Sequence, residues 1–474
     1  MTNRSAARVQ GSVAKAFLVV ALAWNAAGAA PLEPRATPPV QLITLDPGHF
    51  HAALFQKEML PEIAARAHVY APLGPDLTAH LNRIAQFNSR AENPTHWELE
   101  VHASLDCLNR LLDERPGNVV VLSGNNRGKV DRIGALVNAG FHVLADKPWT
   151  IEPEELPRLQ AALEAAQQKG VAAYDAMTQR FEISCLLTRY VVQDPEVFGT
   201  CLSGSVAEPA VEMESVHYLI KEVAGSVLLR PPWFFDVRQQ GEGLTDVGTH
   251  LVDLVQWTLF PNQAIDYRND IAVLRGAHWP TTLSLAQFQA VTAEKTFPPC
   301  VQGAIQNNVL QSFANNTVTY ALRGTIVRLN IEWKLEPPPG AKDTEFAVFR
   351  GTRSRIEVRQ GQEEKFIPEL YVLPNRPEFR PGLRAALERK LESIRPSRPG
   401  LELREHGEGF QVVIPERDRV GHEAHFALLI RQFLGFVRDP KSSPPWEVPN
   451  MLAKYFVTTQ GVKLARENPR KEKP

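Results

Sequence analysis

The chain contains little cysteine and no excess of charge of either sign. Its 474 residues include four cysteines, 52 Lys and Arg, and 53 Asp and Glu, which gives a formal net charge of −1. Four scattered thiols are too few for a disulfide framework or a zinc site. A near-neutral chain has no electrostatic reason to bind nucleic acid or an anionic membrane. These shortages exclude a disulfide scaffold and a basic nucleic-acid-binding protein.

The composition is otherwise that of an ordinary globular protein. Hydrophobic residues make up 44% of the chain and charged residues 22%, which excludes a largely disordered, collagen-like or coiled-coil chain. The length predicts two or three domains with ample core. Prolines outnumber glycines, 37 to 29, so many connections between elements should be stiff.

The N-terminus has the pattern of a secretory signal over residues 1–29. Arg4, Arg8 and Lys15 precede an apolar run at residues 16–23, and Ala27-Gly28-Ala29 forms the cleavage site. The run is too short to span a bilayer, and a Pro-rich spacer follows at residues 30–40. No twin arginine is present, so we expect Sec-type export to the periplasm or the extracellular space. A Cys185–Cys201 bridge stays open for an exported chain.

Strand and helix patterns alternate over residues 41–177. Repeated strand–helix units predict a doubly wound, Rossmann-like parallel sheet. We expect a long helical stretch from His51 into Ala65 after the first strand. The expected strands are 42–45, 68–71, 97–101, 119–122, 141–144 and 171–174.

The second half, residues 178–464, has a different pattern. Period-two alternation around Arg323-Gly324 predicts an antiparallel hairpin, and further short strands follow. Helical periodicity at residues 383–394, 425–437 and 450–464 predicts an insertion and two closing helices. We therefore expect a mostly antiparallel open sheet with helices on one face, followed by a disordered tail at residues 465–474.

Ligands of doubly wound sheets bind beyond the carboxyl ends of the strands. This rule places Asp46–His51, Ser123–Asn126 and Asp146–Trp149 around one crevice. Only Gly48 survives from a G-x-G-x-x-G fingerprint, and Pro72-Leu73-Gly74 stands where an acidic ribose ligand is expected. The sequence signal for dinucleotide binding is therefore weak. The alternative to a dinucleotide-binding domain is an α/β domain that has lost its cofactor or binds it in another way.

Two later motifs carry more information. Asp146-Lys147-Pro148 follows a strand directly, and residues 241–253 read G-E-G-L-T-D-V-G-T-H-L-V-D. Together with the alternating pattern they resemble the Gfo/Idh/MocA oxidoreductases, which carry E-K-P and G-G-G-x-x-x-D-x-G-x-H-x-x-D. The resemblance covers about residues 41–261. Residues 421–455 resemble the C-terminal domain of an exported bacterial branch of that family.

The resemblance implies NAD or NADP as the cofactor, and Lys147, Asp246 and His250 as catalytic residues. It also implies a homodimer formed through the open sheet face. The expected cofactor-binding residues are Gly48, His49, His51, Ser123, Asn125, Asn126 and Lys147. The candidate substrate-binding residues are Arg180, Trp233, Asp253 and Trp257.

The residues themselves suggest acid–base chemistry. At about 100° per residue, Asp246, His250, Asp253 and Trp257 share one helix face. A carboxylate one turn before an imidazole can fix its tautomer, and a base of this kind takes a proton from an alcohol. Lys147 would stabilise the developing alkoxide. The alternative is a structural role, in which His250 only caps or packs an amphipathic helix and Asp246 is its solvated i,i+4 partner. A metal shared by Asp246 and His250 lacks a third ligand, so no metal is predicted.

The sequence therefore predicts an NAD(P)-dependent oxidoreductase that acts on a sugar or glycoside hydroxyl. Redox-assisted glycoside processing, with a tightly bound cofactor recycled in place, is a variant of this hypothesis that suits an exported protein, because free NAD(P) should be scarce outside the cytoplasm. Export in the unfolded state is an objection, since an unfolded chain cannot carry a bound nucleotide. The alternative is a non-catalytic carbohydrate-binding protein on a degenerate oxidoreductase scaffold. His422 and His425 are interpreted as a helix start.

Overall fold

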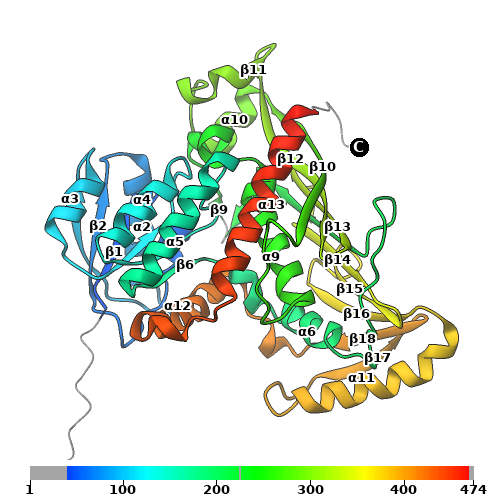
Figure 1. Cartoon of the computed structure of the whole chain (residues 1–474). Helices are drawn as coiled ribbons and strands as arrows, with labels where there is room; N and C mark the ends of the chain where they lie inside the picture. The colour runs from blue at the N-terminus through cyan, green and yellow to red at the C-terminus, as the bar shows by residue number, and fades with distance from the viewer. Residues whose placement is uncertain (1–39, 224–225, 469–474) are drawn as a thin grey trace, which may run out of the picture. The chain divides into compact units, whose positions relative to one another are not determined.

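The computed structural model describes residues 40–223 and 226–468. The predicted signal at residues 1–29 and most of the spacer lie outside these residues. Two sheets dominate the described chain, one parallel and one mostly antiparallel (Figure 1). The predicted fold class is thereby confirmed.

The first sheet has six parallel strands in the order β3-β2-β1-β4-β5-β6. This order is that of a doubly wound dinucleotide-binding sheet. Strands β1 and β4 lie exactly where the apolar runs predicted them. The strands are β1 (Leu42–Leu45), β2 (Arg66–Ala71), β3 (Glu98–Ala103), β4 (Val119–Leu122), β5 (His142–Ala145) and β6 (Ala173–Asp175).

Helices cover both faces of this sheet because its central strands are apolar on both sides. Ile43 and Val120 face one layer, whereas Leu42 and Val119 face the other. The first layer contains α3 (Cys107–Glu114), α4 (Lys129–Asn138) and α5 (Leu156–Lys169), which η1 (Pro153–Glu155) precedes. The second layer contains α1 (His51–Leu54) and α2 (Pro75–Ser89).

The expected long first helix is wrong, because α1 is a single turn that ends at Leu54. Its place in the core is taken by α12 (His422–Arg438), a helix from the far end of the chain. Phe426, Leu429 and Phe433 of α12 are buried against the first sheet. The closing helix predicted for the second domain therefore completes the core of the first.

The second sheet has ten strands in the order β10-β12-β13-β7-β14-β15-β16-β18-β17, with β11 paired to β12. Only the pairing of β7 with β13 is parallel among these described strands. The strands are β7 (Val211–Tyr218), β10 (Ile271–Leu283), β11 (Ile305–Gln306), β12 (Val309–Leu322), β13 (Thr325–Lys334), β14 (Thr344–Arg350), β15 (Ser354–Gln360), β16 (Glu369–Pro374), β17 (Glu402–His406) and β18 (Gly409–Val413).

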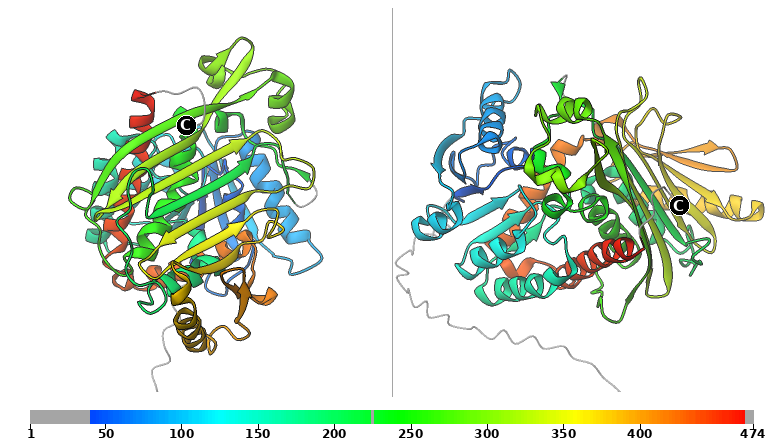
Figure 2. Two further views of the ribbon diagram at one scale, coloured as in Figure 1. Left: turned by 90° about the vertical axis from the view of Figure 1, so that its right-hand side faces the viewer. Right: turned by 90° about the horizontal axis from the view of Figure 1, so that it is seen from above.

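The helices of this half gather on one face of the second sheet, and Figure 2 (left) shows the strands of the other face in front. The main ones are α6 (Ile183–Val192), α9 (Gly248–Leu259), α11 (Arg380–Ile394) and α13 (Glu447–Glu467). The shorter helices and the small hairpin are η2 (Thr178–Phe181), β8 (Glu222–Val223), β9 (Ser226–Val227), η3 (Pro232–Phe235), α7 (Val237–Gln240), α8 (Gly243–Asp246), α10 (Leu285–Thr292), η4 (Pro299–Ala304), η5 (Pro377–Phe379), η6 (Glu416–Asp418) and η7 (Pro440–Ser442).

Helix α13 packs against α5 of the first half and against α9 and β10 of the second. It continues to Glu467, so the predicted tail begins too early, at residue 465. The four cysteines are free thiols, so the Cys185–Cys201 bridge is not formed. Among the described helices, no segment combines the length and hydropathy needed to cross a membrane.

Replacing Phe433 by alanine should destabilise the protein by about 3–5 kcal/mol, because it opens a cavity between α12 and the first sheet. Phe433 is fully buried, whereas Leu428 on the same helix is exposed. Leu428→Ala is therefore the matched control, with an expected change within about 0.5 kcal/mol. Chemical denaturation measures both. Equal stabilities of the two variants would contradict the role given to α12.

Candidate active site

The crevice at the carboxyl ends of the first sheet is formed by three loops, which follow β1, β4 and β5. The first two loops are bonded to each other, because the amides of Gly48 and His49 both donate to the carbonyl of Ser123, at 3.1 and 2.9 Å. Gly124 permits this approach, since an added Cβ would lie 2.1 Å from the carbonyl oxygen of Asp46. We call the region around these loops the crevice.

Asp146 lies at the centre of the crevice. Its Oδ2 atom lies 3.0 Å from His51 Nδ1 and 3.2 Å from His49 Nδ1, and it accepts a 2.9 Å hydrogen bond from the Ser123 hydroxyl. Burial alone would raise the pKa of Asp146, but the neighbouring imidazoles hold it well below its ordinary value. Burial lowers the pKa of His49, and lowers that of His51 to about 4. Both imidazoles are thus neutral at neutral pH.

The catalytic residues expected from the sequence gather beside Asp146. Lys147 donates a 2.5 Å hydrogen bond to Asp246 Oδ1, and both side chains are buried. Burial opposes ionisation of Asp246, but the Lys147 ammonium keeps its pKa below the ordinary value. Burial, together with the nearby Lys147 charge, holds the pKa of His250 well below its ordinary value.

The expected pairing of Asp246 with His250 is wrong. The helix is interrupted at Val247, between α8 and α9, and the amide of His250 donates to the carbonyl of Val247 in a tightened turn. Val247 keeps helical dihedrals, φ −77° and ψ −41°, so the backbone does not account for the missing pair. The Asp246 carboxylate is instead bound by Lys147, and Nδ1 of His250 has no hydrogen-bond partner among the described residues.

Arg180 and Asp253, two of the expected substrate-binding residues, bind each other instead. Arg180 holds Asp253 through two hydrogen bonds of 2.6 and 2.7 Å. Lys454 of α13 bridges Asp253 and Asp175, at 3.0 and 2.8 Å. These side chains are buried, so their polar atoms serve the ion network rather than a ligand. Trp257 is likewise buried, with the Arg189 guanidinium over its ring.

Trp233, the fourth expected substrate residue, lies over the first loop. Its Nε1 donates to Asp76 Oδ2 at 2.9 Å. A Cβ added to Gly48 would lie only 2.8 Å from the Trp233 ring and 3.0 Å from the Asp76 carboxylate. The space above Gly48, where backbone would approach a pyrophosphate, is therefore filled by this chain.

The segment Pro232–Gln240, which we call the closing segment, also binds the second loop. The amide of Asn126 donates to the carbonyl of Gln239, at 2.9 Å, and the Asn126 side chain donates to the carbonyl of Gln240, at 2.8 Å. The Asn125 side chain donates to Gln239 Oε1 at 2.5 Å. Both expected cofactor-binding asparagines thus hold the closing segment.

Two further residues lie in the crevice: Lys129 was not expected from the sequence, and His422 was interpreted as a helix start with lining of the site as the alternative. Lys129 is buried, and its ammonium donates to Asn126 Oδ1 and to the carbonyl of Asp146, at 2.5 and 3.0 Å. Burial lowers its pKa to about 8. His422, the first residue of α12, brings its ring centroid within 5.3 Å of that of His51. The only sequence signal for Lys129 was its position three residues after Asn126. The position of His422 depends on α12, which is distant in the sequence.

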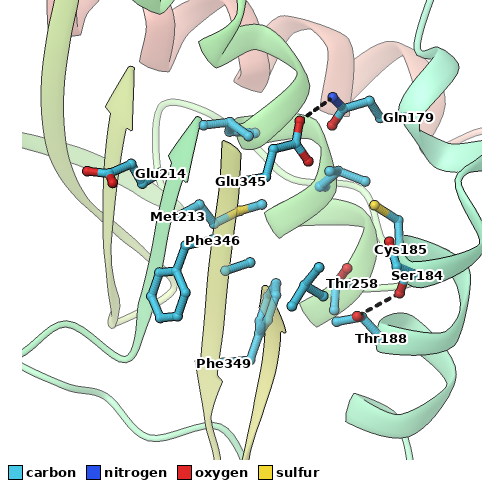
Figure 3. A pocket seen from close by; sticks show the side chains of 14 residues that line it. Gln179, Ser184, Cys185, Thr188, Met213, Glu214, Thr258, Glu345, Phe346 and Phe349 are labelled. Atoms are coloured by element: carbon cyan, nitrogen blue, oxygen red, sulfur yellow. Dashed lines mark hydrogen bonds between the residues drawn. The ribbon is translucent and has the colours of Figure 1, made fainter. Parts of the chain in front are cut away.

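A separate small cavity lies between α6, α9 and the second sheet (Figure 3). Gln179 donates to the Glu345 carboxylate across it, at 3.4 Å, and burial raises the pKa of Glu345. Cys185 and apolar side chains such as Met213 and Phe349 line the rest. None of the expected site residues lines this cavity.

The fold and the crevice define a Rossmann-type oxidoreductase scaffold with a second, open-sheet domain. The family described as "Putative oxidoreductase C terminal domain" matches residues 187–466, which is more than half of the chain. The chain belongs to this family. The resemblance to the Gfo/Idh/MocA oxidoreductases is thereby confirmed.

Solved structures give the same assignment. A putative oxidoreductase from Parabacteroides merdae is 42% identical, with a TM-score of 0.88 over 91% of this chain and 98% of that chain. GenD2 of gentamicin A biosynthesis, solved with NAD, is 14% identical, with a TM-score of 0.54 over 93% and 98%. KijD10, a 3-ketoreductase from Actinomadura kijaniata solved with NADP and TDP-benzene, is 14% identical, with a TM-score of 0.53 over 91% and 98%.

At these identities, GenD2 and KijD10 share the fold with this chain. A search of curated proteins found no match.

Replacing Lys454 by methionine should cost about 3–5 kcal/mol of stability, because it leaves buried carboxylate charge uncompensated. Lys463→Met, at an exposed position of the same helix, is the control, with an expected change within about 0.5 kcal/mol. Denaturant unfolding measures the difference. An unchanged stability in Lys454→Met would contradict a structural role for the network.

Proposed function

We propose that the chain is an exported NAD(P)-dependent oxidoreductase that acts on a hydroxyl group of a sugar or glycoside. The observation that supports this most is the convergence of Lys147, Asp246 and His250 at the carboxyl ends of the parallel strands. A neutral, buried imidazole beside an ammonium is the set of groups that alcohol oxidation needs. Interconversion of a hydroxyl and a carbonyl group is suggested by KijD10, a 3-ketoreductase of the same fold.

His250 is the proton acceptor in this proposal. Its depressed pKa keeps the imidazole unprotonated at neutral pH. Its Nδ1 has no partner among the described residues, so a nitrogen is available to a substrate hydroxyl. Lys147, which is paired with Asp246, stabilises the oxygen as it loses its proton.

The cofactor is NAD or NADP in this proposal, and it supplies the two-electron acceptor. The crevice as described does not fit a dinucleotide. Trp233 and Asp76 fill the space over Gly48, and the amides that would hold a phosphate donate to Ser123. Helix α1 is a single turn, so the dipole that usually faces the pyrophosphate is small. Binding therefore requires the closing segment to leave Gly48.

A second candidate is favoured by the same closed crevice. A carbohydrate-binding protein on a degenerate oxidoreductase scaffold needs no cofactor space, and the hydrogen bonds of Asn125 and Asn126 to the closing segment suit that reading. The two candidates differ in a single property, which is the transfer of hydride from sugar to nicotinamide.

A panel of sugars and glycosides, incubated with the purified protein and NAD or NADP, should give reduced nicotinamide for at least one member. With that sugar, His250→Ala should lower kcat/KM by about 100- to 10,000-fold, because the proton acceptor is lost. Sugar affinity, measured by calorimetry, should change little.

His406→Ala is the matched control, since His406 is an exposed histidine of β17, and its rate should equal that of the parent. Full turnover in His250→Ala would overturn the acid–base assignment. Sugar binding without reduction of either nicotinamide would favour the second candidate.

A further inference from the structure

The crevice contains a second cluster of ligating atoms, which the proposed acid–base chemistry does not use. Residues 49–51 read His-Phe-His, and both imidazoles turn their Nδ1 atoms toward one carboxylate oxygen of Asp146. The three ligating atoms all lie within 4.8 Å of one another. Two histidines and a carboxylate form the ligand set of many three-ligand metal sites.

The separations are a little shorter than those within a tetrahedral coordination shell, so a bound ion would spread the ligands slightly. Ligand bonds of about 2.0–2.2 Å to zinc place neighbouring ligand atoms about 3.3–3.6 Å apart. His51 Nδ1 and His49 Nδ1 lie 3.0 and 3.2 Å from Asp146 Oδ2. Distances of this size also occur in hydrogen bonds, so the protons decide between the two interpretations.

The protons favour a cation. The backbone amide of His51 donates to His49 Nδ1, at 3.4 Å, so this nitrogen presents its lone pair. In the tautomer that carries its proton on Nε2, this nitrogen accepts that bond and faces Asp146 Oδ2, 3.2 Å away, with no proton between the two atoms. A cation between the two atoms converts the repulsion between them into ligation.

The carboxylate supplies an independent observation. Asp146 is 3% exposed, and its Oδ1 atom has no hydrogen-bond partner among the described residues. A buried carboxylate oxygen without a partner is costly. Ser123 and both imidazoles contact the other oxygen of Asp146, Oδ2. A cation bound at Oδ2 would compensate the negative charge of this buried carboxylate.

We propose that His49, His51 and Asp146 bind one divalent first-row metal ion, of the class of Zn²⁺ or Mn²⁺. Imidazole and carboxylate ligands select this class. His422 of α12 lies beside His51, with ring centroids 5.3 Å apart, and is not one of the three proposed ligands. With three protein ligands the remaining position is open to water or to a sugar oxygen, which the ion would polarise.

This site departs from the prediction that the chain holds no metal. That prediction did not consider His49, His51 and Asp146 together, since 95 residues separate His51 from Asp146 in sequence. The site does not rest on the oxidoreductase proposal, because it concerns the binding of an ion in the absence of nicotinamide and sugar.

The test uses the full mature protein, stripped with a chelator and titrated with ZnCl₂, MnCl₂ and CoCl₂ in a calorimeter. We expect one ion per chain at this site. His51→Ala and Asp146→Asn should each weaken binding by about 100-fold or more, beyond the usual cost of losing a second-shell partner. The absorption spectrum of the Co²⁺ form of the unmodified protein should show nitrogen and oxygen ligation, and this readout needs no variant.

His102→Ala is the matched control, because His102 belongs to a different histidine cluster, with His68 and Glu100, on the edge of the first sheet. It should leave the affinity unchanged. Absence of tight binding to the unmodified protein, or loss of binding in His102→Ala but not in His51→Ala, would overturn the proposal.

Discussion

The burial of one carboxylate, that of Asp146, organises the crevice. Asp146 directly follows β5, and its carboxylate binds side chains from the loops after β1 and β4. The backbone carbonyl of Asp146 accepts a hydrogen bond from Lys129. A carboxylate removed from water must be compensated by donors or cations. The next residue, Lys147, carries this charge network to Asp246 in the second half of the chain.

A second constraint is the short first helix. Both faces of a doubly wound sheet must be covered by helices, and α1, which follows β1, is too short to cover its share. Helix α12 supplies the missing apolar surface from more than 350 residues later in the chain. The same helix places His422 beside His51. The packing of α12 against the first sheet therefore also adds a residue to the crevice.

Local patterns in the sequence predicted much of the fold. The run Val119–Leu122 could only be a strand buried on both faces, and Arg323-Gly324 marked a hairpin turn, as the structure shows. The pattern after His51 predicted a long helix wrongly, because tertiary packing by α12 replaced it. Contacts between distant segments have no local signal, and α12 is placed by such contacts.

The candidate site divides in the same way. Motif spacing brought Lys147, Asp246 and His250 together, and the structure gathers them. It did not predict that Asp246 would pair with Lys147, because 99 residues separate the two in the sequence. Nor did motif spacing predict that Trp233, held by Asp76, would cover Gly48. Trp233 lies 157 residues from Asp76 in the sequence, and such a distant contact has no local signal.

The most direct test of the account is the affinity of the purified mature protein for nicotinamide cofactors. The absorbance and native mass as isolated come first, followed by titration with NAD(H) and NADP(H). The account predicts a nicotinamide that is retained or binds at micromolar concentration, with release of the closing segment from Gly48. No cofactor as isolated, and no binding of any of the four forms at millimolar concentration, would contradict it.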